Sequence, residues 1–260
     1  MKGSIFKLSS DLLEERLKFT KRIPKSLGVV GLDHHSCRNS LRKLYNIPVM
    51  EIDVEDSEFR QGKAQSSWHR WFKGSKNRFQ LVSLEPPFWK EGIETFDVLV
   101  SNLYLVRKSL YKRQLFTMWR TFLCPGGWLF FSFLGPESFA EIYRLFDQYC
   151  SAESPTYQLD MQMIGDELLQ QGFIEPVISS ESLHLTYRKL GTLIKDLEDL
   201  GVLSSMLSWL NISQHRFGEV LRKAIFELTT FQVTYEFVFA HALKSTKGTS
   251  EQEIRFYKPR

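Results

Sequence analysis

The sequence predicts an α/β fold in which a mostly parallel sheet carries helices on both faces and ends in an antiparallel strand. Residues 96–100 are largely apolar and end in Ser101-Asn102, as expected where a buried parallel strand reaches a ligand crevice at its carboxyl end. A Pro-Gly-Gly sequence at 125–127 predicts a turn into residues 128–133, which are apolar on both faces. Residues 233–239 place large apolar side chains at every second position, which predicts a terminal strand.

The amino-terminal half alternates between helix and strand patterns, which predicts βαβ units and a parallel sheet. Residues 10–21 place Leu12, Leu13 and Leu17 among charged residues, the pattern of an amphipathic helix. Pro24 is expected to end this helix. The elements expected after it are strand 27–32, helix 39–45, strand 48–54, helix 58–72 and strand 78–84.

The carboxyl-terminal half predicts further helices and the last strands. The expected elements are helices 138–149, 163–171, 188–200 and 217–231, with strand-like segments at 175–180 and 183–187. Helical spacing predicts core positions for Leu190, Leu193, Ile194, Leu197 and Leu200. We expect a single domain over 1–244, with a helical insertion at about 150–230, and a disordered polar tail at 245–260.

The length and composition favour one large α/β domain in a reducing compartment. The chain has 260 residues, of which 43% are hydrophobic, enough for the core of one α/β domain. Cys37, Cys124 and Cys150 stand far apart, so neither a disulfide framework nor a zinc site is expected. The amino terminus lacks the apolar core of a signal peptide, and no run of about 18 apolar residues occurs. We therefore expect a cytoplasmic protein that neither is secreted nor spans a membrane.

The net charge of +4 is too small to predict nucleic-acid binding, but the basic residues are clustered. The first basic cluster contains His69, Arg70, Lys73, Lys76 and Arg78 around Trp68, Trp71 and Phe72; the second contains Arg107, Lys108, Lys112, Arg113 and Arg120. Each cluster is compatible with docking of an acidic partner and with an ordinary solvated helix face.

Five segments, in this order and spacing, carry a resemblance to a known family. They are FDVLVSNLYL at 96–105, LCPGGWLFFSFLGPESFAEI at 123–142, DMQMIGDELLQQGFIEPVIS at 160–179, LTYRKLGTLIKDLEDLGV at 185–202 and VTYEFVFAHA at 233–242. The chain resembles, over about residues 8–244, the BioC group of class I S-adenosylmethionine methyltransferases. This resemblance implies a Rossmann-like sheet, S-adenosylmethionine as cofactor and a helical insertion on the substrate side. It also implies methylation of the free carboxylate of a malonyl group on acyl carrier protein, in biotin biosynthesis.

The glycine-rich turn of that family is altered here. The family motif D-L-G-C-G-T-G follows a Pro-Lys pair, and Pro24-Lys25 align it on residues 29–35. Only the first glycine remains, as Gly31, while Asp33 and His35 place side chains where the family has bare backbone. Because backbone must approach the cofactor closely at such a turn, added side chains crowd the site. The turn is either rebuilt and functional, with Gly31 and Asp33 at the cofactor, or impaired.

The resemblance implies further cofactor residues at the ends of the following strands. Asp53 matches the acid that binds the ribose hydroxyls, and one carboxylate can accept both hydrogen bonds. The family has an aspartate for the adenine amine where this chain has Ser83, with Glu85 two residues later. The implied cofactor-binding residues are Gly31, Asp33, Asp53, Ser83, Glu85 and Ser101.

The substrate side departs from the family pattern as well. A Gln-Trp pair that follows the fourth strand in the family is Val106-Arg107 here. Arg107 is a candidate to hold a malonyl carboxylate bidentately, although an ordinary surface arginine is the competing interpretation. Methyl transfer to a carboxylate needs no general base, because this nucleophile is already charged at neutral pH, so no catalytic residue is assigned. The Asp, His and Cys residues at 33–37 are too local to predict a metal site.

Three functional interpretations follow from these patterns. The first is an active methyltransferase of the BioC type. The second is an impaired paralogue that keeps the fold as a protein-binding module, since the departures concentrate at the glycine turn, the adenine strand and the Gln-Trp pair. The third is a relative that acts in assembly of a respiratory complex, which the carboxyl-terminal segments favour less.

Overall fold

The computed structural model describes residues 5–20, 23–31, 36–55, 79–83, 96–107, 112–146 and 159–246. The helix expected at 58–72, the first basic cluster, Asp33, Glu85 and the tail beyond residue 246 lie outside these ranges.

Seven strands in the described part of the chain form one sheet, in the order β3-β2-β1-β4-β5-β7-β6. They are β1 (Leu27–Val30), β2 (Val49–Glu55), β3 (Phe79–Ser83), β4 (Phe96–Ser101), β5 (Leu123–Leu134), β6 (Phe173–Tyr187) and β7 (Phe231–Lys244). The pairs from β3 to β5 are parallel, whereas β7 is antiparallel to both β5 and β6. The predicted mostly parallel sheet with an antiparallel terminal strand is therefore confirmed.

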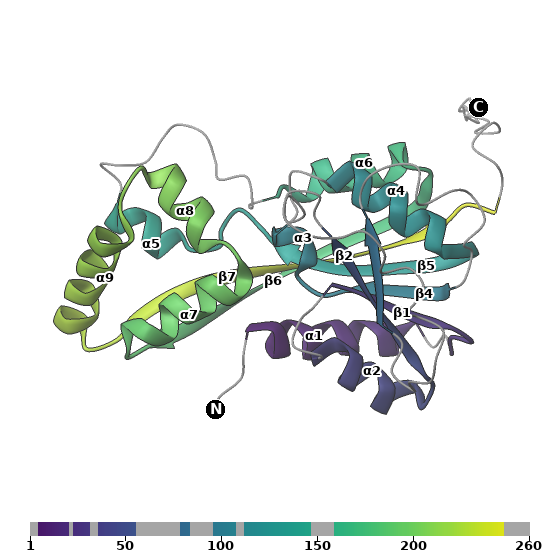
Figure 1. Cartoon of the computed structure of the whole chain (residues 1–260), viewed down its shortest axis with the longest axis horizontal. Helices are drawn as coiled ribbons and strands as arrows, with labels where there is room; N and C mark the ends of the chain where they lie inside the picture. The colour runs from purple at the N-terminus through teal and green to yellow at the C-terminus, as the bar shows by residue number, and fades with distance from the viewer. Residues whose placement is uncertain are drawn as a thin grey trace, which may run out of the picture.

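Helices cover both faces of the sheet, as predicted. Figure 1 shows α1 (Ile5–Phe19) and α2 (Ser36–Tyr45) below the sheet, and α4 (Lys112–Phe122) and α6 (Met161–Gln170) above it. The short α3 (Tyr104–Arg107) follows β4 directly. The chain order moves outward from β1 to β3 and then returns to the other side of β1 at β4. In sheets of this kind, ligands bind at the carboxyl ends of the strands where this reversal occurs.

A second group of helices collects around the far ends of β6 and β7 (Figure 1). It comprises α5 (Ala140–Leu145), α7 (Leu190–Leu200), α8 (Leu203–Leu210) and α9 (Gln214–Leu228). The rings of Phe146 and Phe217 stack at 5.2 Å between centroids, which ties α9 to the segment after α5. Leu193, Leu197 and Leu200 are buried, and Leu190 and Ile194 pack against them, so the predicted core positions of this helix are confirmed.

Two predicted breaks in the sheet are wrong. Residues 125–127 do not end an element: Leu123 already pairs with Phe96 and Trp128 with Val98, so the intervening residues form a bulge within β5. Gly126 takes φ 71°, which glycine adopts without strain. The segments expected at 175–180 and 183–187 are one strand, because the polar residues between them pair with β7 without interruption. An edge strand tolerates such polar residues, since one side of it faces solvent.

Candidate functional site

The carboxyl ends of β1 and β4 lie side by side at the point where the strand order reverses. Val30 is in register with Ser101, and the backbone N–H of Gly31 donates to the carbonyl of Ile52 at 2.8 Å. Gly31 thus adds one hydrogen bond to the pairing of β1 with β2. Its partner, Ile52, directly precedes Asp53. Three of the residues expected at the cofactor, Gly31, Asp53 and Ser101, therefore lie on or directly after three adjacent strands, β1, β2 and β4.

Gly31 is tightly packed against an aromatic residue that the sequence reasoning missed. Its φ is 90°, and a Cβ at this position would stand 2.6 Å from Cγ of Tyr104. Only glycine fits here, both because of the backbone conformation and because the Tyr104 side chain occupies the space. Tyr104 is the first residue of α3 and is only 6% exposed. Its position three residues after the polar end of β4 was the available signal.

Ser101 uses its hydroxyl within the sheet. Its Oγ donates to the carbonyl of Val30 at 3.2 Å, and the residue is fully buried. This bond ties the last residue of β4 to the last residue of β1, directly before the glycine. Ser101 therefore helps to hold the ends of β1 and β4 together.

A buried polar network holds the segment that follows Ser101. Asn102 donates through Nδ2 to the carbonyl of Phe6 at 2.9 Å, and its Oδ1 accepts from Oγ of Ser132 at 3.1 Å. The same Ser132 oxygen accepts the backbone N–H of Leu103 at 3.0 Å and lies 3.0 Å from Oγ of Ser9. These bonds join α1, β4 and β5, and they support Leu103 at a φ of 55°. A satisfied buried network of this kind is rigid.

Of the other predicted site residues, Asp53, Ser83 and Arg107 lie in the described part of the chain. Asp53 pairs with Leu81 on the next strand, Ser83 ends β3 opposite Glu55, and Arg107 ends α3. Asp33 and Glu85 lie outside the described residues.

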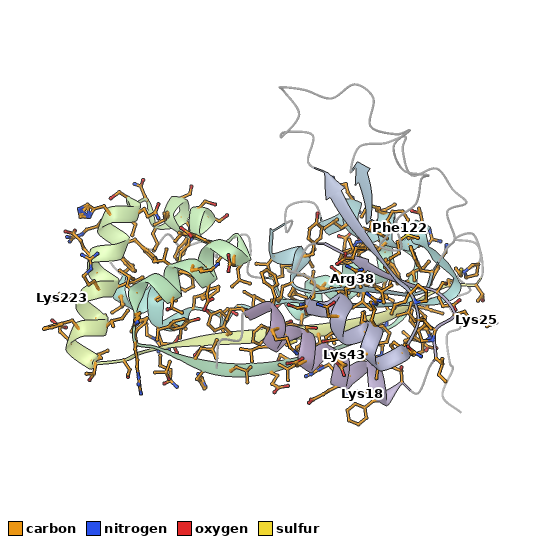
Figure 2. The ribbon with its side chains drawn as sticks, turned by 60° about the horizontal axis from the view of Figure 1, so that its bottom comes forward. Lys18, Lys25, Arg38, Lys43, Phe122 and Lys223 are labelled. Atoms are coloured by element: carbon orange, nitrogen blue, oxygen red, sulfur yellow. The ribbon has the colours of Figure 1, made fainter. Side chains whose placement is uncertain are left out.

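A nearly buried ion pair fastens α2 to β2. Nη1 of Arg38 donates to Oε2 of Glu51 at 3.1 Å, and the two side chains are 11% and 8% exposed. Figure 2 labels Arg38 and Lys43 on α2 and Lys18 on α1, and both lysines are exposed. The helix α2 begins five residues after Gly31. The ion pair therefore fixes against β2 the first helix that follows this glycine.

The second basic cluster is engaged within the chain where its side chains are described. Nε of Arg113 donates to Oε1 of Glu167 at 3.3 Å. The Arg120 guanidinium packs against Gly172, with Nε 3.0 Å from the position that a Cβ there would take. These contacts fasten α4 to α6 and to the turn after it.

A cavity of about 380 Å³ lies elsewhere, between α1 and strands β5, β6 and β7. Its aromatic wall contains Trp128, Phe130 and His241, and burial lowers the pKa of His241. Arg16 stands at its edge, 3.8 Å from the centroid of the Phe239 ring and paired with Glu181. None of the predicted cofactor residues lines this cavity.

Within the described ranges, no group of His, Cys, Asp and Glu side chains is arranged to hold a metal ion. No helix in those ranges is long and apolar enough to cross a membrane.

The chain matches no family model. Among curated proteins it is 30% identical over 259 residues to malonyl-acyl-carrier-protein O-methyltransferase of Nitrosospira multiformis, covering 92% of this chain and 82% of that protein. It is 28% identical over 268 residues to malonyl-acyl-carrier-protein O-methyltransferase 1 of Coxiella burnetii, covering 97% and 86%. The Legionella pneumophila enzyme of the same name is 25% identical over 260 residues, covering 95% and 86%.

Among solved structures, the YcgJ protein of Bacillus subtilis is similar in fold, with a TM-score of 0.51. The alignment covers 92% of this chain and all of that one, at 12% identity, and so speaks for the fold alone.

Proposed function

The chain belongs to the malonyl-acyl-carrier-protein O-methyltransferase family, and from this membership we propose that it methylates the free carboxylate of a malonyl group carried by acyl carrier protein. S-adenosylmethionine is the methyl donor. The observation that carries the proposal is the 30% identity over nearly the whole chain, combined with a strand reversal that places Gly31 beside the end of β2.

The residues present fit the cofactor at this edge of the sheet. Gly31 carries no side chain at the reversal point, and the Tyr104 ring lies in the space that a Cβ there would take. Asp53, in the carboxyl-terminal half of β2, is proposed to accept hydrogen bonds from both ribose hydroxyls. We propose that Ser83 and Glu85 bind the adenine ring and that Asp33 belongs to the cofactor-binding turn. Ser101 is proposed to support the site by its hydrogen bond from β4 to β1.

The chemistry demands positioning more than acid–base catalysis. The cofactor supplies a methyl group activated by a positively charged sulfur. When bound, held by Asp53 and Gly31, it would donate that methyl group to a malonyl oxygen and keep the electron pair on its sulfur. Opposite charges cancel in this step, so a water-excluded site favours it, and no proton has to move. We propose that Arg107 orients the malonyl carboxylate before transfer.

Acyl carrier protein carrying a malonyl group is the proposed partner, and the proposed compartment is the cytoplasm, which the three separated cysteines favour. The two basic clusters of the sequence are proposed to dock the acidic carrier protein. The alternative of a non-catalytic paralogue gains no support from the comparisons, since the relatives above carry the name of the enzyme.

Titration with S-adenosylhomocysteine tests the cofactor site. We expect saturable binding to the full chain, and we expect Asp53→Ala to weaken it about tenfold or more because two charge-assisted hydrogen bonds are lost. Asp199→Ala, on the exposed face of α7, is the matched control and should bind as the wild type does. Heat indistinguishable from dilution at millimolar ligand contradicts the proposal.

A further inference from the structure

Tyr104 occupies the space beside Gly31 in which a Cβ would lie. The ring begins 2.6 Å from where a Cβ of residue 31 would stand, so it takes the space that the absence of a side chain leaves. Tyr104 is 6% exposed, and it enters this space from the helix that follows β4. A ligand atom cannot contact Gly31 from this side while the ring stays there.

The backbone that carries Tyr104 is firmly anchored. The residue before it, Leu103, donates its N–H to Ser132 and accepts the N–H of Val106 at 3.2 Å. Asn102 is bound to α1 and β5, and Ser101 is bound to β1. Moving this segment breaks several buried hydrogen bonds together, each costly to leave unmade. Rotation of the tyrosine side chain breaks none of these backbone anchors.

We propose that Tyr104 determines the affinity of this protein for its adenosyl cofactor: the ring and the methionine part of the cofactor compete for the same face of Gly31. This inference rests on the proposed function, because it takes the crevice between β1 and β4 as the cofactor site. The cofactor binds the conformer in which the Tyr104 ring has rotated away from Gly31. The measured affinity is lowered by the fraction of molecules in which the ring has not rotated.

The test is calorimetric titration of S-adenosylhomocysteine into the full-length wild type and into Tyr104 variants. Tyr104→Ala and Tyr104→Leu remove the ring from the face of Gly31, and we expect about tenfold tighter binding or more, with faster association. Tyr104→Phe keeps the ring, so it should not gain the tenfold tighter binding of these two variants. Tyr143→Ala is the matched control, since it deletes a tyrosine ring that packs on Trp209 in the distant helical group.

If the wild type binds S-adenosylhomocysteine and Tyr104→Ala and Tyr104→Leu bind it equally or more weakly, the proposed competition is wrong. The proposed function is not affected by that result. Absence of binding in the wild type and in every variant overturns both.

A second measurement keeps the inference testable if the smaller variants do not fold. The wild-type chain with 3-fluorotyrosine at position 104 reports the environment of the ring by fluorine NMR. Competition predicts that saturating S-adenosylhomocysteine moves the resonance from a buried to a solvent-exposed position. A resonance that keeps its buried position at saturation overturns it.

Discussion

Arg38 on α2 and Glu51 on β2 form an ion pair at 3.1 Å from which most solvent is excluded. Neither residue was among those expected at the site, yet their pairing fastens α2 to β2. Loss of one partner leaves the other charge buried, which typically costs about 3–5 kcal/mol.

Arg38→Ala is therefore expected to lower the free energy of unfolding by about 3 kcal/mol or more, as measured by urea denaturation. Lys195→Ala removes a cation from an exposed pair with Asp199 and serves as control, with a change of about 0.5 kcal/mol or less. Equal effects of the two substitutions would show that the Arg38 pair is no more than a surface contact.

Ser132→Ala should destabilise the fold by about 1–3 kcal/mol, because it removes a hydroxyl that contacts Ser9, Asn102 and Leu103 inside the protein. Thermal unfolding of this variant, compared with Ser182→Ala on the exposed edge strand, measures the effect. The same substitution should raise hydrogen exchange at the Leu103 amide, and unchanged exchange there would contradict the role of Ser132 as its anchor.

Gly31→Ala and Tyr104→Ala are expected to be energetically coupled. In the wild-type background, Gly31→Ala meets both the Tyr104 ring and the positive φ of 90°. With Tyr104→Ala present, only the backbone term of about 1 kcal/mol remains. A double-mutant cycle of unfolding free energies should show a coupling of about 1 kcal/mol or more. Additive effects would place the ring away from residue 31.

Alkaline pH should destabilise the protein through a buried pair of tyrosines. Tyr187 lies 2.7 Å from Oδ2 of Asp196 and 2.8 Å from the hydroxyl of Tyr235. Burial raises the pKa of both tyrosines above the ordinary value of about 10. Above pH 10 the unfolded chain releases these protons while the folded chain keeps them. Stability is therefore complete below pH 10 and falls as pH rises.

Each such tyrosine contributes a slope of about 1.4 kcal/mol per pH unit. Tyr235→Phe should therefore show a shallower loss of unfolding free energy between pH 10 and 11.5 than the wild type, in urea denaturation at fixed ionic strength. Thr186→Ala, an exposed position on β6 that does not titrate, is the control and should keep the wild-type slope. A Tyr235→Phe slope equal to that of the wild type would contradict the raised pKa.

Local sequence patterns predict most of the strands, including the adjacent ends of β1 and β4. The apolar run before Ser101 ends where β4 ends, and Gly31 directly follows β1. These features are local, because each depends on the side chains of a few consecutive residues. The Pro-Gly-Gly sequence at 125–127 is compatible with a bulge as well as with a turn. Only the pairing of Leu123 with Phe96 and of Trp128 with Val98 distinguishes the two.

The contacts that decide the site were beyond the sequence patterns, because they join residues far apart in the chain. Tyr104 meets Gly31 across two strands, and Ser132 meets Asn102 and Ser9 across three elements. One signal was available: Ser132 is a lone polar residue within the apolar strand β5. A buried hydroxyl in such a strand requires a hydrogen-bond partner, and Asn102 supplies one.

Methyl transfer itself is the most direct test of the proposed function. The full chain is incubated with S-adenosylmethionine and malonyl-acyl carrier protein, with acetyl-acyl carrier protein as the control that lacks a free carboxylate, and the products are analysed by mass spectrometry. The account predicts one added methyl group on the malonyl carrier only, formed in proportion to S-adenosylhomocysteine. An unmodified malonyl carrier after prolonged incubation, under conditions in which an authentic family member completes the reaction, would contradict it.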